Sequence, residues 1–436
     1  MRVLVIVAVW VLTAIPALAE VKIQEVTSPG GIKAWLVEEH SIPFTALELR
    51  FRGGTSLDAA DTRGATSLMV ALLEEGAGDK DARAFTEASE ALAAKFRFRP
   101  YDDAVSVSAR MLTENRDQAV ALLRDSLVAP RFDADAIERV RGQVISSIRS
   151  DLKDPDAIAM ARLDALAFGD HPYGHPTDGT EDSVAALTRD DLLSAHRGAL
   201  ARDRVYVSAA GDITAEELGA LLDTLLGDLP ETGAPMPEDV PVALTGGVDV
   251  VPFDTPQSVA VFAQEGIARD DPDFFAAYVM NTILGNGGFE SRLMDEVREK
   301  RGLTYGVYSY LVPKDHAALY LGRVASANET VAEAIKVIRD EWEKMARDGA
   351  TEAELTRVKT YLTGAYPLRL DGNASIADIL VGMQMDGLSP DYVNTRNAKV
   401  EALTLDDIKR VAARLLDPDT LTFVVVGRPV GLETPG

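Results

Sequence analysis

The sequence predicts an α+β protein of two tandem homologous domains, each a mostly antiparallel sheet with helices packed on one face. Three observations predict this fold. A segment of the first half recurs in the second half, β-type runs precede long helical stretches in each half, and a stretch rich in Pro and Gly separates the halves. A chain of 436 residues also exceeds the size at which a single core stops growing.

Residues 1–19 have the composition of a secretory signal peptide. Arg2 precedes an apolar run, and Pro16 and small residues follow before Glu20. We expect cleavage near Ala19/Glu20 and export to a periplasm. A retained membrane anchor is the alternative, but the apolar run is short for a bilayer, and no later stretch has spanning length. We therefore expect no membrane anchor after cleavage.

Each half begins with β-type runs and continues into helical stretches. We place the first domain at residues 20–228, a linker at 229–247 and the second domain at 248–436. The predicted strands are Ile32–Glu38 and Thr45–Phe51 in the first half, and Val248–Val251 and Ser258–Glu265 in the second. The linker is rich in Pro and Gly and has little apolar periodicity.

The two halves also end alike. Leu187–Gly211 and Leu403–Gly427 align without a gap, and each contains a Thr-capped helix, a short loop and a β-run that ends in Gly. Upstream, Ala134–Arg141 pairs loosely with Glu352–Lys359 at nearly the same offset. The chain is therefore predicted to be an internal duplication.

Composition excludes several functions. The chain has no Cys, so it has neither disulfides nor a thiol nucleophile. Its formal charge of −25 makes nucleic acid an unsuitable partner, because phosphate binding needs a basic surface. The acidity could attract basic peptides, although plain solubility explains it equally simply.

The rest of the chain is organised around Leu284–Leu311. Gly285, Gly287 and Gly288 allow tight turns, and Ser291 is placed to cap the helix that follows. The loop is thus expected to lead directly into a helix.

Amphipathic spacing predicts that helix from Arg292 to Lys300, and Gly302 ends it. The composition from Thr304 to Leu311 is typical of a strand. The order of helix, tight turn and strand predicts that Arg301 and Tyr305 lie side by side.

The phrase from Ser291 to Ser309, S-R-L-M-D-E-V-R-E-K-R-G-L-T-Y-G-V-Y-S, resembles the C-terminal-domain signature of the insulinase/pitrilysin family of zinc metallopeptidases, the inverzincins. The resemblance implies paired α+β domains that curve into a half-shell. In two-chain bacterial members, the Arg and Tyr of this phrase reach the partner's zinc site and hold the substrate backbone. By resemblance, Arg301 and Tyr305 form a substrate-binding and transition-state clamp in trans. Composition alone would equally allow a salt bridge and a strand aromatic.

The neighbouring loop is a second candidate for substrate contact. Asn286, Gly287, Gly288 and Phe289 could offer backbone groups to an extended peptide. A plain tight turn is an equally good interpretation of these residues.

The catalytic motif of the family is missing. An inverzincin site needs H-x-x-E-H on a helix, with two His ligands and a Glu general base. Alignment places Ser67 and Ala71 at the two His positions and Val70 at the base. Counting back from Asp154 places Ser147 at the third ligand. None of these side chains is a good zinc ligand, so we expect no metal in this chain.

The histidines do not supply another site. His171 and His175 are four apart, but the prolines around them exclude a helix. A loop zinc site is the alternative, and a structural loop is the plainer interpretation. His40, His196 and His316 stand alone in the sequence.

The leading hypothesis is a non-catalytic, substrate-binding subunit of a heterodimeric periplasmic zinc metalloendopeptidase. In this hypothesis a zinc-bearing paralogous subunit holds the metal and a peptide is the substrate. A proteolytically silent scaffold or assembly subunit of the same fold is the alternative. An independent hydrolase has no supporting group of residues in the sequence.

Overall fold

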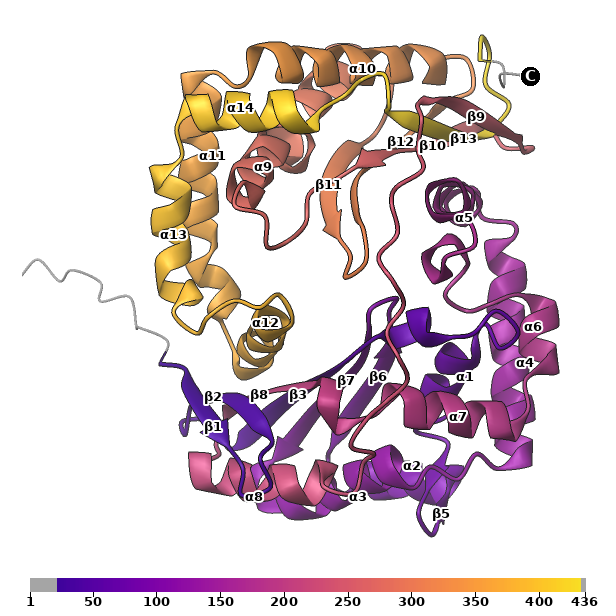
Figure 1. Cartoon of the computed structure of the whole chain (residues 1–436), viewed down its shortest axis with the longest axis vertical. Coiled ribbons are helices and arrows are strands. Elements are labelled where there is room, and N and C mark those ends of the chain that lie inside the picture. The colour runs from indigo at the N-terminus through magenta and orange to yellow at the C-terminus, as the bar shows by residue number, and fades with distance from the viewer. Residues whose placement is uncertain (1–21, 433–436) are drawn as a thin grey trace, which may run out of the picture.

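The computed structural model describes residues 22–432 and consists of two α+β domains that face each other (Figure 1). The predicted signal peptide lies outside the described residues. Within residues 22–432, no helix combines the length and the apolar character needed to cross a bilayer.

The first domain is built on a six-stranded sheet in the order β1-β2-β8-β3-β7-β6, in which only the pair β2 and β8 is parallel. Its strands are β1 (Gln24–Thr27), β2 (Lys33–Glu38), β3 (Phe44–Arg52), β6 (Lys95–Pro100), β7 (Ala104–Leu112) and β8 (Val205–Gly211), and a small hairpin comprises β4 (Gly76–Ala77) and β5 (Lys80–Asp81). Its helices are α1 (Ala65–Ala71), α2 (Ala82–Ala91), α3 (Arg116–Val128), α4 (Ala134–Asp151), α5 (Pro155–Phe168), α6 (Glu181–Ala186), α7 (Arg189–Ala199) and α8 (Ala215–Leu226).

The second domain repeats this plan on a five-stranded sheet in the order β11-β12-β10-β13-β9, in which only β13 and β9 are parallel. Its strands are β9 (Gly247–Pro252), β10 (Gln257–Glu265), β11 (Val307–Pro313), β12 (Ala318–Ala327) and β13 (Thr422–Gly427). Its helices are α9 (Phe274–Asn281), α10 (Val331–Asp348), α11 (Glu352–Ala365), α12 (Asn373–Met385), α13 (Tyr392–Ala402) and α14 (Leu405–Leu415).

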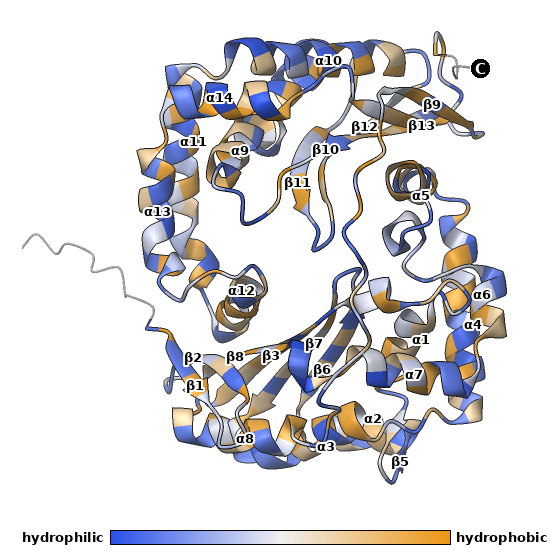
Figure 2. Cartoon of the chain, viewed as in Figure 1, coloured by the Kyte–Doolittle hydropathy of each residue, from blue (hydrophilic) through white to orange (hydrophobic). Residues whose placement is uncertain are grey.

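The predicted fold class is confirmed, and the duplication is visible in detail. In each half the terminal strand, β8 or β13, lies between an antiparallel and a parallel neighbour. The helix before it begins with the same capping box, Thr188 with Asp191 and Thr404 with Asp407. Hydrophobic and hydrophilic residues alternate along helices such as α10 and α14, as expected where one helix face is buried (Figure 2).

Each sheet is also covered by a helix from the other domain, which the sequence did not predict. In α5, Ala159, Leu163 and Ala167 pack against Val261 and Val424 of the second sheet. In return α12 packs on β8 and β3 of the first sheet, so each domain lends one helix to its neighbour (Figure 1).

The contact of α12 with the first sheet is close and partly polar. Ala377 packs on Ala46 and Ala210, and the Ser208 hydroxyl donates a 2.6 Å hydrogen bond to the Ala377 carbonyl. Small side chains at these positions let the helix approach the strands closely. Residues 228–246, between α8 and β9, contain no helix or strand. The predicted linker boundaries stay a prediction.

The exchanged helices should couple the two domains in unfolding. Leu163 is fully buried. Leu163→Ala should lower the free energy of unfolding by about 2–5 kcal/mol, because it removes methyl groups and leaves a cavity. Trp342 is buried in the second domain, and Trp35 lies on β2 of the first, where it packs with Leu380 and Met383 of α12. In urea titrations, single-tryptophan variants of a chain starting at Glu20 therefore report the second domain and the first domain with its docked α12.

In Leu163→Ala, the urea concentration at the unfolding midpoint should fall by the same amount for both tryptophan signals. The exposed neighbour Ala161 provides the control, and Ala161→Ser should change stability by less than about 0.5 kcal/mol. Two separate transitions, with only the first domain weakened, would show that α5 does not hold the domains together.

Candidate functional site

The positions predicted for the family's metal ligands and general base lie on α1 and α4. Ser67 is buried, and its hydroxyl donates a 3.0 Å hydrogen bond to the carbonyl of Thr177. Val70 is buried in the core, whereas Ala71 and Ser147 are exposed. An alkyl side chain has no ligand atom and a serine hydroxyl is a weak one, so these residues do not fit zinc.

The histidines form no metal site either. His171 uses both ring nitrogens: Nε2 contacts the Glu238 carbonyl at 3.1 Å and Nδ1 accepts from the Tyr173 amide at 3.2 Å. The Nε2 of His196 contacts the Leu127 carbonyl at 2.8 Å inside the core. Throughout residues 22–432, no group of three or more His, Cys, Asp or Glu side chains is placed to hold a metal ion.

Two π-helical segments frame the glycine-rich loop. They comprise Thr282–Asn286 and Met294–Glu299. The predicted α-helix from Arg292 to Lys300 is thus mostly π-helical, a rare conformation that often marks functional sites. The predicted cap is also wrong, because the Ser291 hydroxyl donates to the Gly288 carbonyl at 2.9 Å instead of accepting from the helix.

Two glycines of this region are required for different reasons. A Cβ on Gly285 would lie 2.2 Å from the Ser309 hydroxyl, so this Gly permits close contact with β11. Gly288 has a φ of +59°, in the left-handed region. Phe289 is 66% exposed, and the Arg298 guanidinium lies 4.6 Å from the centre of its ring. The structure thus presents Asn286, Gly288 and Phe289 at the surface.

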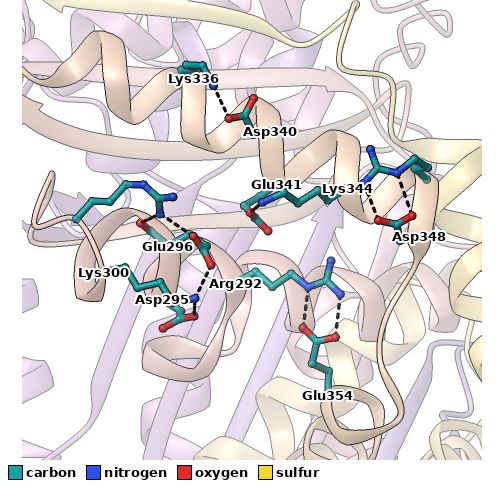
Figure 3. Close-up of polar contacts among 12 residues, drawn as sticks. Arg292, Asp295, Glu296, Lys300, Lys336, Asp340, Glu341, Lys344, Asp348 and Glu354 are labelled. Carbon is teal, nitrogen blue, oxygen red and sulfur yellow. Dashed lines mark hydrogen bonds and ion pairs between the residues drawn. The ribbon is translucent and has the colours of Figure 1, made fainter.

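An ion pair just before the second π-helical segment anchors it to α11 (Figure 3). Arg292 binds Glu354 through two hydrogen bonds of 2.7 and 2.8 Å, and it also donates to the Gly349 carbonyl at 2.9 Å. Burial raises the pKa of Glu354, but hydrogen bonds from Arg292 and Thr351 outweigh it and lower the pKa to about 2. This bidentate pair is the strongest tie between the π-helical segment and the helices behind it.

Arg301 is held by Glu296. Its Nη1 donates to the Glu296 carbonyl at 2.7 Å and to the Glu296 carboxylate at 2.6 Å. Hydrogen bonds from Lys300 and Arg301 lower the pKa of Glu296, so this carboxylate stays charged. Within the described part of the chain, Nε and Nη2 of Arg301 make no hydrogen bond. Half of the guanidinium is therefore available to a ligand.

Tyr305 is presented by a tightly bound loop. Its flanking neighbour Thr304 donates a 2.6 Å hydrogen bond to the Ala325 carbonyl and accepts one from the Gly306 amide at 3.0 Å. Val307, two residues beyond, is buried, yet Tyr305 itself is 85% exposed. The strand begins at Val307 and not at Thr304 as predicted. The loop thus holds the phenol of Tyr305 in solvent. Arg301 makes its hydrogen bonds to Glu296 and not to Tyr305.

Sequence reasoning missed a cavity of about 410 Å³ that lies beside these segments. It is bounded by α9, β11, α12 and α13, and Asn286 from the glycine-rich loop reaches it. Its aromatic lining includes Tyr278, Tyr310, Tyr366 and Tyr392. The only signal in the sequence was the run of alternating tyrosines in β11.

Comparison with protein families gives two matches. Residues 34–181 match the family described as insulinase (peptidase family M16), and residues 186–362 match the peptidase M16 inactive domain. The second match includes both π-helical segments, Arg301 and Tyr305.

Individual relatives extend over most of the chain. An uncharacterized zinc protease of Mycobacterium bovis is 30% identical over 396 residues, which cover 89% of this chain and 90% of the relative. A non-peptidase homolog of Helicobacter pylori is 26% identical, covering 89% and 90%. A crystal structure of a peptidase M16 inactive domain from Pseudomonas fluorescens is 30% identical, has a TM-score of 0.88, and covers 95% of this chain and 100% of that chain.

The pair of Arg292 and Glu354 should give the protein a defined acid sensitivity. Because the folded pKa of Glu354 lies below its ordinary value of 4.5, its contribution to stability is present above pH 4.5 and is lost as the pH falls towards 2. Glu354→Gln should lower the free energy of unfolding at neutral pH by on the order of 2–3 kcal/mol. The deficit relative to wild type should shrink below about pH 4.5.

Urea titrations between acidic and neutral pH measure this difference. Glu352→Gln, at an exposed position in the first turn of the same helix, is the matched control and should show no such pH-dependent deficit. An equal deficit for Glu354→Gln at all pH values would exclude the charged pair as its cause.

Proposed function

Since the chain belongs to the insulinase family of peptidases, family M16, we propose that it is the non-catalytic, substrate-binding subunit of a periplasmic zinc metalloendopeptidase. A paralogous subunit with an intact H-x-x-E-H motif supplies the zinc ion and the general base. This chain supplies Arg301 and Tyr305 to the active site of that partner.

One observation carries the proposal. The residues predicted at the zinc ligands and the base, Ser67, Ala71, Ser147 and Val70, are unsuited to those roles, while the segment with Arg301 presents the phenol of Tyr305 85% exposed. The well-bonded loop around Tyr305 has no need of that ring for its own packing. A site for a group outside this chain explains why the loop holds it there.

The names of relatives support both parts of the proposal. The Helicobacter pylori relative is named a non-peptidase homolog, which agrees with the loss of the metal site. A relative in Schizosaccharomyces pombe, 25% identical over 96% of this chain, is named a probable subunit beta of the mitochondrial-processing peptidase. A silent scaffold of the same fold would have no use for the exposed Arg301 and Tyr305 pair.

The chemistry of the two side chains suits a developing negative charge. A guanidinium with free N–H groups can bind a substrate carbonyl, and a phenol can donate a hydrogen bond to an oxyanion. Asn286 and the backbone of Gly287, Gly288 and Phe289 lie on the neighbouring loop and can contact the peptide beside them.

Association with the partner is the first test. The chain alone should hold no stoichiometric zinc and cleave no peptide. Co-expressed with an H-x-x-E-H paralogue from the same genome, it should elute as a heterodimer. Two chains that enclose a peptide between them should bury at least about 1,200 Å² in total, the area typical of a stable interface. The complex should contain zinc and cleave a peptide.

Gel filtration, elemental analysis and a fluorogenic peptide assay measure these outcomes. Each chain expressed alone is the control. Separate elution at micromolar concentration, together with an inactive mixture, would contradict the pairing. One zinc ion per isolated chain and chelator-sensitive cleavage would contradict its non-catalytic role.

The clamp residues are tested in the reconstituted complex. Tyr305→Phe removes one hydroxyl and keeps the ring, and Arg301→Ala removes the guanidinium. Each change should lower kcat by roughly a hundredfold, because one oxyanion donor typically contributes on the order of 3 kcal/mol to the transition state. Heterodimer formation should be unchanged.

Two neighbouring residues provide matched controls. Tyr361→Phe alters another exposed tyrosine, and Lys300→Ala removes the other cation that contacts Glu296. Both variants should keep near wild-type turnover. If Arg301→Ala and Tyr305→Phe also do so, the pair is structural and the clamp assignment fails.

A further inference from the structure

The first sheet carries a cluster of cations on the face opposite its main core. Strand register places Lys95 opposite Arg110, Arg97 opposite Ser108, and Arg99 opposite Ser106. On the next strand Arg50 lies opposite Ser106. Because alternate residues of a strand share one face, five cations point to the same side of three adjacent strands. We call Arg50, Lys95, Arg97, Arg99 and Arg110 the cationic face.

Of the five cations, only Arg50 forms an ion pair within residues 22–432. Arg110 and Arg97 also lie near carboxylates, because their charges act to lower the pKa values of Glu48 and Glu74 against the rise that burial causes. Arg50 contacts the Ser106 hydroxyl, lies 3.5 Å from the Glu48 carboxylate and donates a 2.6 Å hydrogen bond to Asp378 of α12. The other four are exposed, and within residues 22–432 they form no ion pair or hydrogen bond. Arg50 thus engages both Glu48 and Asp378.

The cationic face lines a cavity and not a flat surface. The cavity measures about 530 Å³ and has α12 as its opposite wall, through Ala374, Ser375 and Asp378. Tyr101 adds aromatic surface at its margin. Helix α12 packs on β8 and β3, and the cations of β6 and β7 extend beyond it towards the edge of the sheet. The cavity is thus built jointly by both domains.

We propose that the cationic face binds an acidic segment of a peptide in extended conformation, and so selects peptides that carry Asp or Glu there. The proposal rests on the proposed function only in taking that peptide to be the substrate. Alternate side chains of an extended peptide are spaced about 6.6 Å apart, the same spacing as Lys95, Arg97 and Arg99. Guanidinium groups bind carboxylates with two hydrogen bonds, which suits an Asp or Glu in each position.

The observations favour a peptide over a nucleic acid. The chain has a net charge of −25, so its long-range field repels a polyanion, whereas a short acidic segment needs only the local field of the cavity. A cavity of about 530 Å³ has room for a few side chains and not for a duplex. The Ser106 hydroxyl, which accepts from Arg50, keeps its own proton for a peptide carboxylate, whereas the Ser108 hydroxyl already donates to Glu48 at 2.7 Å.

Peptide binding to the isolated chain tests this proposal without the partner subunit. The probe is a fluorescein-labelled peptide with a run of Asp and Glu, and its counterpart has Asn and Gln at the same positions. Fluorescence anisotropy should show that the acidic peptide binds at least about tenfold more tightly, and that added salt weakens its binding. Arg97→Glu with Arg99→Glu should weaken it by about tenfold or more, because each reversal replaces attraction by repulsion.

Lys33→Glu is the matched control, since Lys33 is also an exposed strand residue of the same sheet, on β2. It should leave the affinity unchanged. Equal affinity for the acidic and neutral peptides would overturn the proposal, as would unchanged binding by the Arg97→Glu, Arg99→Glu variant. Tighter binding of inorganic polyphosphate or of a single-stranded oligonucleotide would overturn the assignment to peptide.

The test separates this inference from the proposed function. The anisotropy measurement needs neither the partner nor cleavage, so an inactive heterodimer leaves its result unchanged. Conversely, a failure of acidic-peptide binding leaves the roles of Arg301 and Tyr305 to be judged by turnover alone.

Discussion

The reciprocal packing of α5 and α12 is the interaction on which the rest of this structure depends. Each helix belongs by sequence to one domain and buries its apolar face on the sheet of the other. Ion pairs follow the same exchange: Asp156 of α5 binds Arg323 of the second sheet, and Asp378 of α12 binds Arg50 of the first. The domains therefore cannot move apart without exposing apolar surface and separating these charges. This fixed arrangement lets residues from both domains line one cavity.

The candidate clamp illustrates how an irregular segment is stabilised by its surroundings. Two π-helical segments, a left-handed Gly288 and an exposed Tyr305 are all locally unfavourable or unusual. They are held by the half-buried pair of Arg292 and Glu354, by the hydrogen bond from Thr304 to β12, and by the close contact of Gly285 with β11. Regular elements on three sides thus position a segment that would not keep this conformation alone.

The sequence revealed the features that depend on local pattern. The capping boxes at Thr188 and Thr404, the early strands and the duplication could all be predicted. Caps and strand alternation depend on residues close together in the sequence, and a repeat is found by comparing two segments of it. The π-helical segments were not, since an amphipathic spacing does not distinguish an α-turn from a π-turn. The helix exchange was not predicted because the apolar residues of α5 would suit the face of either sheet. The cationic face had a local signal in the alternation Lys95-Phe96-Arg97-Phe98-Arg99, but its partner cations on β3 and β7 depend on register.

The exchange of helices also has a consequence for how the chain is made. Helix α5 ends at Phe168, whereas β13, a strand of the sheet that it covers, ends at Gly427. During synthesis its apolar face has no surface to cover until nearly the whole chain has emerged. An N-terminal domain that folds first would expose the apolar face of α5 and the sheet face that α12 later covers. Both surfaces would be prone to aggregation. Keeping the chain unfolded until β13 has been made, for example by a chaperone, removes that hazard.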